Sequence, residues 1–320
     1  MTSRLTPQGI AMTKYIVRRL LWLPVVLVVV SLLTFTLGLY GPGDPVQMWF
    51  GQRNNPEAVA RIRHEHGFDR PLLVQYSDYA WKVLHGDFGE SLKYRGQPVA
   101  ELIRRGLWIS VQINVASMLL GMLVGIPLGV IAALRRNTLL DYLTMSGVVL
   151  GISLPVFFVA PILLAIFAWW LRILPPGGWN GLFSRSAALP VLVLTFGPIA
   201  VFARQTRANL GEVLDEDYVR TARAKGLPES VVIGRHALRN AFIPLFTIVG
   251  LMMGGLVEGA FITETVFGIP GFGRLTVDAL FARDYPVIMA NILIVAVAYT
   301  LANLVIDIGY PLVDPRIRYR

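Results

Sequence analysis

Asp215–Pro244 reads DEDYVRTARAKGLPESVVIGRHALRNAFIP, a charged segment between two strongly apolar ones. Three acidic residues open it, where negative charge favours the N-terminus of a helix. Gly226 follows the basic end of that helix, in the position where a glycine ends one. Pro228 is tolerated in the first turn of a second helix. The segment predicts a helix–turn–helix that lies in water between two membrane spans, and its role depends on what docks there.

The composition places the rest of the chain in a membrane. Of its 320 residues, 55% are hydrophobic and only 15% are charged, whereas a soluble domain carries about 25% charged residues. The mean hydropathy is +0.59, and several windows exceed the roughly 20 apolar residues that cross a bilayer. Cysteine is absent, which excludes disulfide and thiolate chemistry. The fold class predicted is therefore an all-α polytopic membrane protein.

Six transmembrane helices can be drawn along the chain. The third predicted span is interrupted by Pro155 and Pro161, and the fourth is short unless it is tilted or extended. Glycines spaced four apart, such as Gly121, Gly125 and Gly129, predict close packing between helices. The six spans are Ile16–Tyr40, Leu107–Leu134, Leu139–Leu171, Leu189–Phe202, Pro244–Phe267 and Val287–Gly309.

Basic residues orient these spans. The chain has a net charge of +9. Its basic residues are concentrated in the N-terminal tail, in the loops between spans two and three and between spans four and five, and in the C-terminal tail, which the positive-inside rule makes cytoplasmic. This pattern indicates that the basic residues orient the spans and contact lipid headgroups, and it argues against nucleic-acid binding. Residues 1–15 and 310–320 are then cytoplasmic tails, residues 16–40 an uncleaved signal anchor, and residues 107–309 the membrane core with its cytoplasmic loop at 205–243. Translation from Met1 or from Met12 remains open.

The long segment 41–106 falls on the opposite side of the membrane. Its aromatic residues supply enough apolar surface for a small helical extracytoplasmic subdomain between the first two spans. Val59–His66 and Leu72–Leu84 both have the pattern of amphipathic helices, and a linker is expected near Gly86–Gly96.

Catalytic signatures are missing. None of the lysines stands in the Gly-Lys-Ser/Thr sequence of a phosphate-binding loop. His64 and His66 lack the i, i+4 spacing of a helical metal site, so no metal ligands are assigned. Among ionisable residues, Glu258 is the best candidate to line a polar substrate path, with Gln112 and Asn114 as weaker companions. Asp141, Glu264 and Asp307 are expected at membrane interfaces.

Several stretches together resemble one family. Arg220-Thr221-Ala222-Arg223-Ala224-Lys225-Gly226 corresponds to the cytoplasmic EAA loop of binding-protein-dependent ABC importers, although the leading Glu and first Ala are replaced. With HALRNAFIP after it, the loop is similar to the version found in membrane subunits of the dipeptide/oligopeptide branch. Supporting stretches are Asp87–Ser91 with Pro98-Val99, Glu264–Gly273 and Asp314–Tyr319.

This resemblance implies a type I ABC importer permease fold and a set of partners. They are a second, homologous permease subunit, two cytoplasmic ATPases that bind the ATP and Mg, and an extracytoplasmic solute-binding protein that delivers peptide. This chain would hold no cofactor and catalyse nothing itself. It would lie in the plasma or inner membrane of a bacterium or archaeon.

The resemblance also assigns residues to the contact with the ATPase. The first helix of the charged segment would seat in a cleft on one ATPase, through Asp217, Arg220, Thr221, Ala222, Lys225, Gly226 and Leu227. The loop that contains Arg135, Arg136 and Asp141 would supply a smaller second contact.

Two other classes of polytopic membrane protein would show different residues in the spans. An ion-coupled secondary transporter would need more paired charges at mid-membrane, and an intramembrane enzyme would need a nucleophile–base pair that the spans lack. Within the permease family the substrate stays open, because relatives also carry nickel chelates, glutathione and some sugars.

Overall fold

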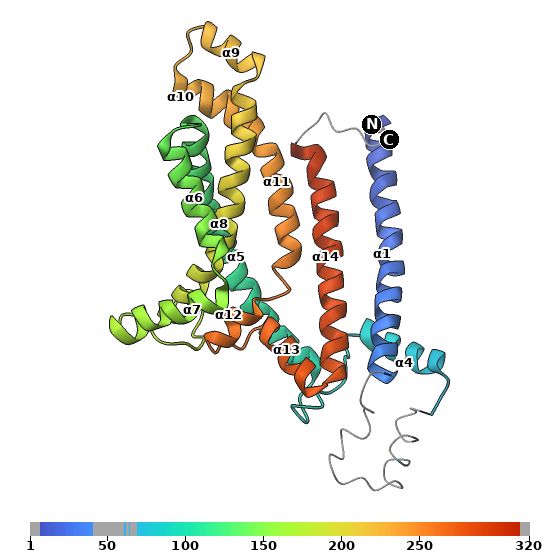
Figure 1. Ribbon diagram of the computed structural model, residues 1–320. Coiled ribbons are helices and arrows are strands. Elements are labelled where there is room, and N and C mark those ends of the chain that lie inside the picture. Colours follow the sequence, from blue (N-terminus) through green and yellow to red (C-terminus); the bar gives the residue numbers. More distant parts are fainter. Residues whose placement is uncertain (1–6, 41–60, 62–63, 65–68, 314–320) are drawn as a thin grey trace.

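The computed structural model describes residues 7–40, 61, 64 and 69–313, and this part of the chain consists of helices and turns (Figure 1). Its single isolated β-bridge joins Glu90 and Pro98. Helices dominate because backbone N–H and C=O groups in lipid find partners only within their own segment. The predicted all-α class is confirmed for the described residues.

Five helical stretches are long and apolar enough to cross a bilayer. The bent pair of α6, Leu139–Ser153, with α7, Val156–Leu164, and the π-helical turn η1, Ala165–Trp170, brings the number to six when it is taken as one span. The five are α1, Pro7–Tyr40; α5, Val99–Leu134; α8, Arg185–Leu214; the continuous run of α10, Glu229–Val231, η2, Val232–Ala237, and α11, Leu238–Gly255; and α14, Tyr285–Val313.

The third predicted span is not one straight helix. Its two halves meet at 93°, so that α7 points away from the bundle in Figure 1. Leu154 is extended, with φ −82° and ψ 123°, because the ring of a following proline disfavours the helical conformation. Pro155 therefore ends α6, whereas Pro161 stays inside α7.

Two other predicted spans differ in length. The short span Leu189–Phe202 is the middle of α8, which continues through Pro198 and past Arg207. The span Pro244–Phe267 is wrong as a single helix, because α11 ends at Gly255 and the chain turns before the short helix α12, Phe261–Val266. Gly259 in this turn has φ 83°, and a Cβ there would lie 2.4 Å from the backbone N of Gly273.

The centre of the bundle is the contact between α5 and α8. A Cβ added at Gly121 would lie 2.2 Å from Pro198 Cβ, and one at Gly129 would lie 2.5 Å from the carbonyl oxygen of Ala203. The predicted close packing along this glycine ridge is confirmed. On the other side α11 packs against α14, where Gly250 faces Ile306.

The outer subdomain packs on α1. The predicted helix Leu72–Leu84 is confirmed as α4, whereas Val59–His66 lies outside the described residues. The ring of Tyr79 stacks on Phe35 of α1 at 5.1 Å between centroids, and burial raises the pKa of Tyr79 to about 12. Tyr76 shares a hydrogen bond of 2.8 Å with Ser31. A turn-rich segment then leads from α4 into α5, with positive φ at Gly86, Gly89 and Gly96.

Candidate functional site

The first helix of the charged segment is α9, Asp217–Ala224, and it stands at one end of the bundle (Figure 1). Val219 and Ala222 are buried and pack with Val232 of η2, over the partly buried Val213 and Leu214 of α8. Gly226 follows the helix with φ 77°, in the left-handed region where glycine carries no penalty. Pro228 precedes α10. The predicted helix–turn–helix is confirmed.

Polar contacts hold α9 in place. Arg223 on α9 donates two hydrogen bonds to the carboxylate of Glu229, at 3.2 and 2.7 Å, and this partner raises the pKa of Arg223. Asn240 of α11 donates to the Tyr218 hydroxyl at 2.8 Å. Because η2 joins α10 to α11 without a break, α9 is fixed to a continuous helix that enters the membrane.

Most of the predicted docking residues lie on the exposed side of α9 and its C-terminal turn. They are Asp217, Arg220, Thr221, Lys225, Gly226 and Leu227. Ala222 differs, because its side chain is only 6% exposed and packs inward. It lies one residue after Thr221 and three after Val219, which puts it on the buried face of the helix. Ala222 therefore anchors α9 and is not placed to contact a partner.

The loop between α5 and α6 is tied to the same end of the bundle. Asp141 is 1% exposed and accepts hydrogen bonds from Arg207 Nε at 2.5 Å and Nη2 at 2.7 Å. The backbone N–H of Asn137 donates to it at 3.0 Å. Arg136 pairs with Asp215 just before α9, at 3.0 Å. Arg135 and Arg136 are exposed, but Asp141 is an internal anchor and cannot meet a partner as predicted.

Asp141→Ala is expected to destabilise the chain by about 2 kcal/mol, because it leaves the guanidinium of Arg207 partly buried without its carboxylate. Arg136→Ala is the matched control, since both partners of that pair are more than half exposed and such pairs contribute about 0–1 kcal/mol. Thermal unfolding in detergent measures both. Equal losses for the two variants would contradict the assignment, and Arg207→Met added to Asp141→Ala should recover part of the stability.

The three residues predicted for a substrate path are only partly brought together. Glu258 lies outside a helix and is exposed, in the turn between α11 and α12, where it accepts a hydrogen bond from Tyr299 at 3.3 Å. Asn114 of α5 donates to the carbonyl of Leu256 in the same turn, at 2.9 Å. Gln112 lies two positions earlier on α5, a spacing that puts it on a different face of the helix.

Glu264, which the sequence predicts at a membrane interface, is instead a buried carboxylate. It is the best-formed polar centre at the end of the bundle opposite α9. Glu264 of α12 is 1% exposed and accepts from Ser110 at 2.6 Å, from the Ala260 N–H at 3.0 Å and from the Arg274 N–H at 2.7 Å. Arg274 belongs to α13, Phe272–Ala282. This Glu264 cluster fastens α5, α12 and α13 together.

Glycines give the Glu264 cluster its compactness. A Cβ at Gly271 would lie 2.4 Å from Glu264 Cδ, and one at Gly106 would lie 3.1 Å from the backbone N of Phe272. That N–H donates to the Ser110 hydroxyl at 2.8 Å. The signal in the sequence was a glutamate followed within ten residues by three glycines, since a buried carboxylate needs backbone donors at close range.

A second buried carboxylate, Asp284, fastens the outer loop. It is 1% exposed and precedes α14. The Ser91 hydroxyl donates to it, as do the N–H groups of Leu92 at 3.1 Å and Lys93 at 3.2 Å. The Tyr94 N–H in turn donates to the Ser91 oxygen at 2.8 Å. This Asp284 cluster therefore joins the segment before α5 to the start of the last helix.

A bundle of helices long and apolar enough to cross a bilayer, with an amphipathic helix held firmly at one end, defines a multi-pass membrane protein. Comparison with known proteins gives the family. The family model described as "Binding-protein-dependent transport system inner membrane component" matches residues 125–319. A second family model, for the N-terminal part of such membrane components, matches residues 12–98. The chain belongs to this family of inner-membrane transport components. The predicted resemblance and the type I importer fold class are confirmed.

Curated relatives match over nearly the whole chain. The oligopeptide transport system permease protein OppB of Salmonella typhimurium is 38% identical over 310 residues, which cover 96% of this chain and 100% of that protein. The dipeptide transport system permease proteins DppB of Bacillus subtilis and of Escherichia coli K12 are each 38% identical, over 96% and 97% of this chain and 98% and 100% of their own lengths. The family is one of transport permeases and not of enzymes.

Proposed function

We propose that this chain is the permease subunit of an ATP-driven importer that carries dipeptides or oligopeptides across the membrane. The observation that carries the proposal is α9, a short helix whose apolar side is locked to the bundle and whose polar side is exposed. The oligopeptide and dipeptide permeases to which the chain is 38% identical support the peptide substrate.

In this proposal α9 is the site where a cytoplasmic ATPase docks. Two ATPase subunits hold the ATP and Mg, a second related permease completes the pore, and an extracytoplasmic binding protein delivers the peptide. The basic residues around α9 support a cytoplasmic position for it and for both termini. The exposed face of α9, together with Arg135 and Arg136, meets the ATPase.

The contacts of α9 suggest how its movement reaches the pore. Its apolar side rests on α8 and η2, and η2 runs into α11, whose Gly254 lies against the ring of Tyr299 on α14. A displacement of α9 therefore moves α8 and α11 together. Such rigid-body motion of packed helices between two discrete arrangements is how alternating access works.

Uptake into proteoliposomes tests this proposal. The complete complex should take up labelled dipeptide or oligopeptide when ATP is enclosed with the ATPases and binding protein is added on the other side, and an uncoupler should leave the rate unchanged. Non-hydrolysable ATP should stop it. Uptake that follows a proton gradient without ATP would instead indicate an ion-coupled transporter. Competition by a nickel chelate, glutathione or a sugar, with none by peptide, would refute the peptide substrate alone.

A further inference from the structure

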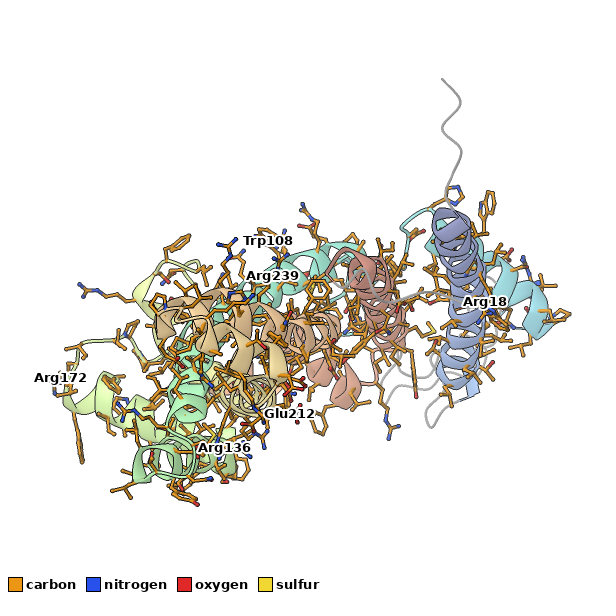
Figure 2. The ribbon with its side chains drawn as sticks, turned by 90° about the horizontal axis from the view of Figure 1, so that it is seen from above. Arg18, Trp108, Arg136, Arg172, Glu212 and Arg239 are labelled. Atoms are coloured by element: carbon orange, nitrogen blue, oxygen red, sulfur yellow. The ribbon has the colours of Figure 1, made fainter. Side chains whose placement is uncertain are left out.

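Two pockets open at the end of the bundle opposite α9, and they share Arg105 and Pro270 in their walls. The first has a volume of about 360 Å³ and is lined by Tyr94, Arg105, Arg274 and Asp278, among others. The second, of about 550 Å³, is lined by Arg104, Arg105, Trp108, Ile109 and Pro270. Trp108 is 67% exposed and lies at the edge of the bundle (Figure 2).

Each wall of the first pocket is fixed from behind by its own buried carboxylate. The Glu264 cluster holds the backbone of Arg274 and, through Ser110, that of Phe272. The Asp284 cluster holds the backbone of Lys93 and, through Ser91, that of Tyr94. The backbone that carries these cationic side chains is thus preorganised, which lowers the entropic cost of binding a ligand.

The charges around the two pockets are not balanced. Glu101 binds both Arg104 and Arg105, at 2.9 and 2.6 Å. Asp278 lies 3.8 Å from both Lys93 Nζ and Arg274 Nε, which is beyond hydrogen-bond distance. Four cationic side chains therefore share two carboxylates, and two positive charges remain uncompensated among these six residues. The guanidinium groups are suited to a carboxylate, which they bind in a bidentate manner.

The position of the pockets points to an occupant outside the membrane. With 36 residues, α5 is about 54 Å long, well beyond the roughly 30 Å of a hydrocarbon core. Arg104, Arg105 and Trp108 lie in its first three turns. Arginine beside tryptophan and tyrosine is the composition that dominates the energetics of protein–protein interfaces.

We propose that these pockets, between the loop held by Asp284 and the helix held by Glu264, receive an acidic side chain of the solute-binding protein. The carboxylate of the binding protein pairs with Arg274, which Asp278 approaches only to 3.8 Å, on the pocket wall that faces Arg105, and an apolar neighbour packs beside Trp108. This inference rests on the proposed function, because it requires a binding protein as partner.

The test uses the full complex in nanodiscs of zwitterionic lipid, with ATP hydrolysis measured against the concentration of its cognate solute-binding protein loaded with peptide. Arg274→Gln is expected to raise the half-stimulating concentration about tenfold, with a weaker dependence on salt. Asp278→Asn is expected to lower it, because the competing carboxylate is gone. Arg185→Gln is the matched control: this exposed arginine begins α8 at the same end of the bundle, outside both pockets, and its curve should overlay that of the wild type.

Several results would overturn the assignment. One is a curve for Arg274→Gln that overlays the wild type. Another is equal weakening by Arg274→Gln and Asp278→Asn, which marks a structural role. A third is a shift that appears only in nanodiscs with anionic lipid, which would make the pockets a headgroup site. If the wild-type complex is not stimulated at all, the proposed function fails together with the pocket; stimulation without a shift in the variants removes the pocket alone.

Discussion

Thr221→Trp is expected to abolish ATP-driven uptake while the chain still folds and reaches the membrane. Thr221 is exposed and lies on the face of α9 opposite the buried Val219 and Ala222. Its hydroxyl donates a hydrogen bond within the same helix, to the carbonyl of Asp217 at 2.9 Å. An indole at this exposed position points away from the buried side of α9, into the surface proposed to meet the ATPase.

The expected loss is large because the substitution acts at the centre of the proposed docking surface. Residues in such positions contribute about 2 kcal/mol or more to association, which is about a 30-fold weaker complex. Co-purification of the ATPase with the permease measures this directly, beside uptake. Thr221→Ser is the control, since it keeps the hydroxyl and the size. Normal uptake by Thr221→Trp with the ATPase still bound would remove α9 from the docking surface.

Glu264→Ala is expected to cause the largest loss of stability of any single substitution considered. Three donors, the buried Ser110 hydroxyl and the partly buried N–H groups of Ala260 and Arg274, lose as their acceptor a carboxylate that is 1% exposed. Each unsatisfied buried donor costs about 1–3 kcal/mol, so a loss of at least about 3 kcal/mol follows. The midpoint of thermal unfolding in detergent should fall by roughly 10 °C.

Glu258→Ala provides the comparison, because Glu258 is an exposed glutamate six residues earlier with one long contact to Tyr299. It should shift the midpoint by no more than a surface substitution does, within about 0.5 kcal/mol. Glu264→Gln should fall between the two, because its amide oxygen still accepts one set of donors while its NH₂ group opposes the rest. A Glu264→Ala protein as stable as Glu258→Ala would contradict the role of the cluster.

Local signals in the sequence were sufficient for the helix–turn–helix. The acidic start, Gly226 and Pro228 each act within a few residues, so that the order of the chain is enough to predict α9 and the turn after it. Close helix packing along the ridge of Gly121 and Gly129 was equally predictable, since the spacing of the glycines alone marks one face of a helix. Which side of α9 is buried was harder. Ala222 was assigned to the partner and instead packs on Val232.

Features that depend on distant residues were not predictable in this way. Hydropathy shows Pro155 and Pro161 as similar interruptions, but only Pro155 ends a helix, and the 93° bend follows from it. Glu264 looked like an interface residue because its donor Ser110 lies 154 positions earlier in the chain. No local signal marks Asp284, since its donors come from the loop 91–93.

The exposed face of α9 is where we expect this chain to touch the ATPase. The chain has no cysteine, so Arg220→Cys places one thiol on that face, where a benzophenone maleimide can be attached. Irradiation of the assembled complex should give a permease–ATPase adduct, and the same label at Arg185→Cys, at the opposite end of the bundle, should give none. The absence of an ATPase adduct from position 220, or equal adducts from both positions, would contradict docking on α9.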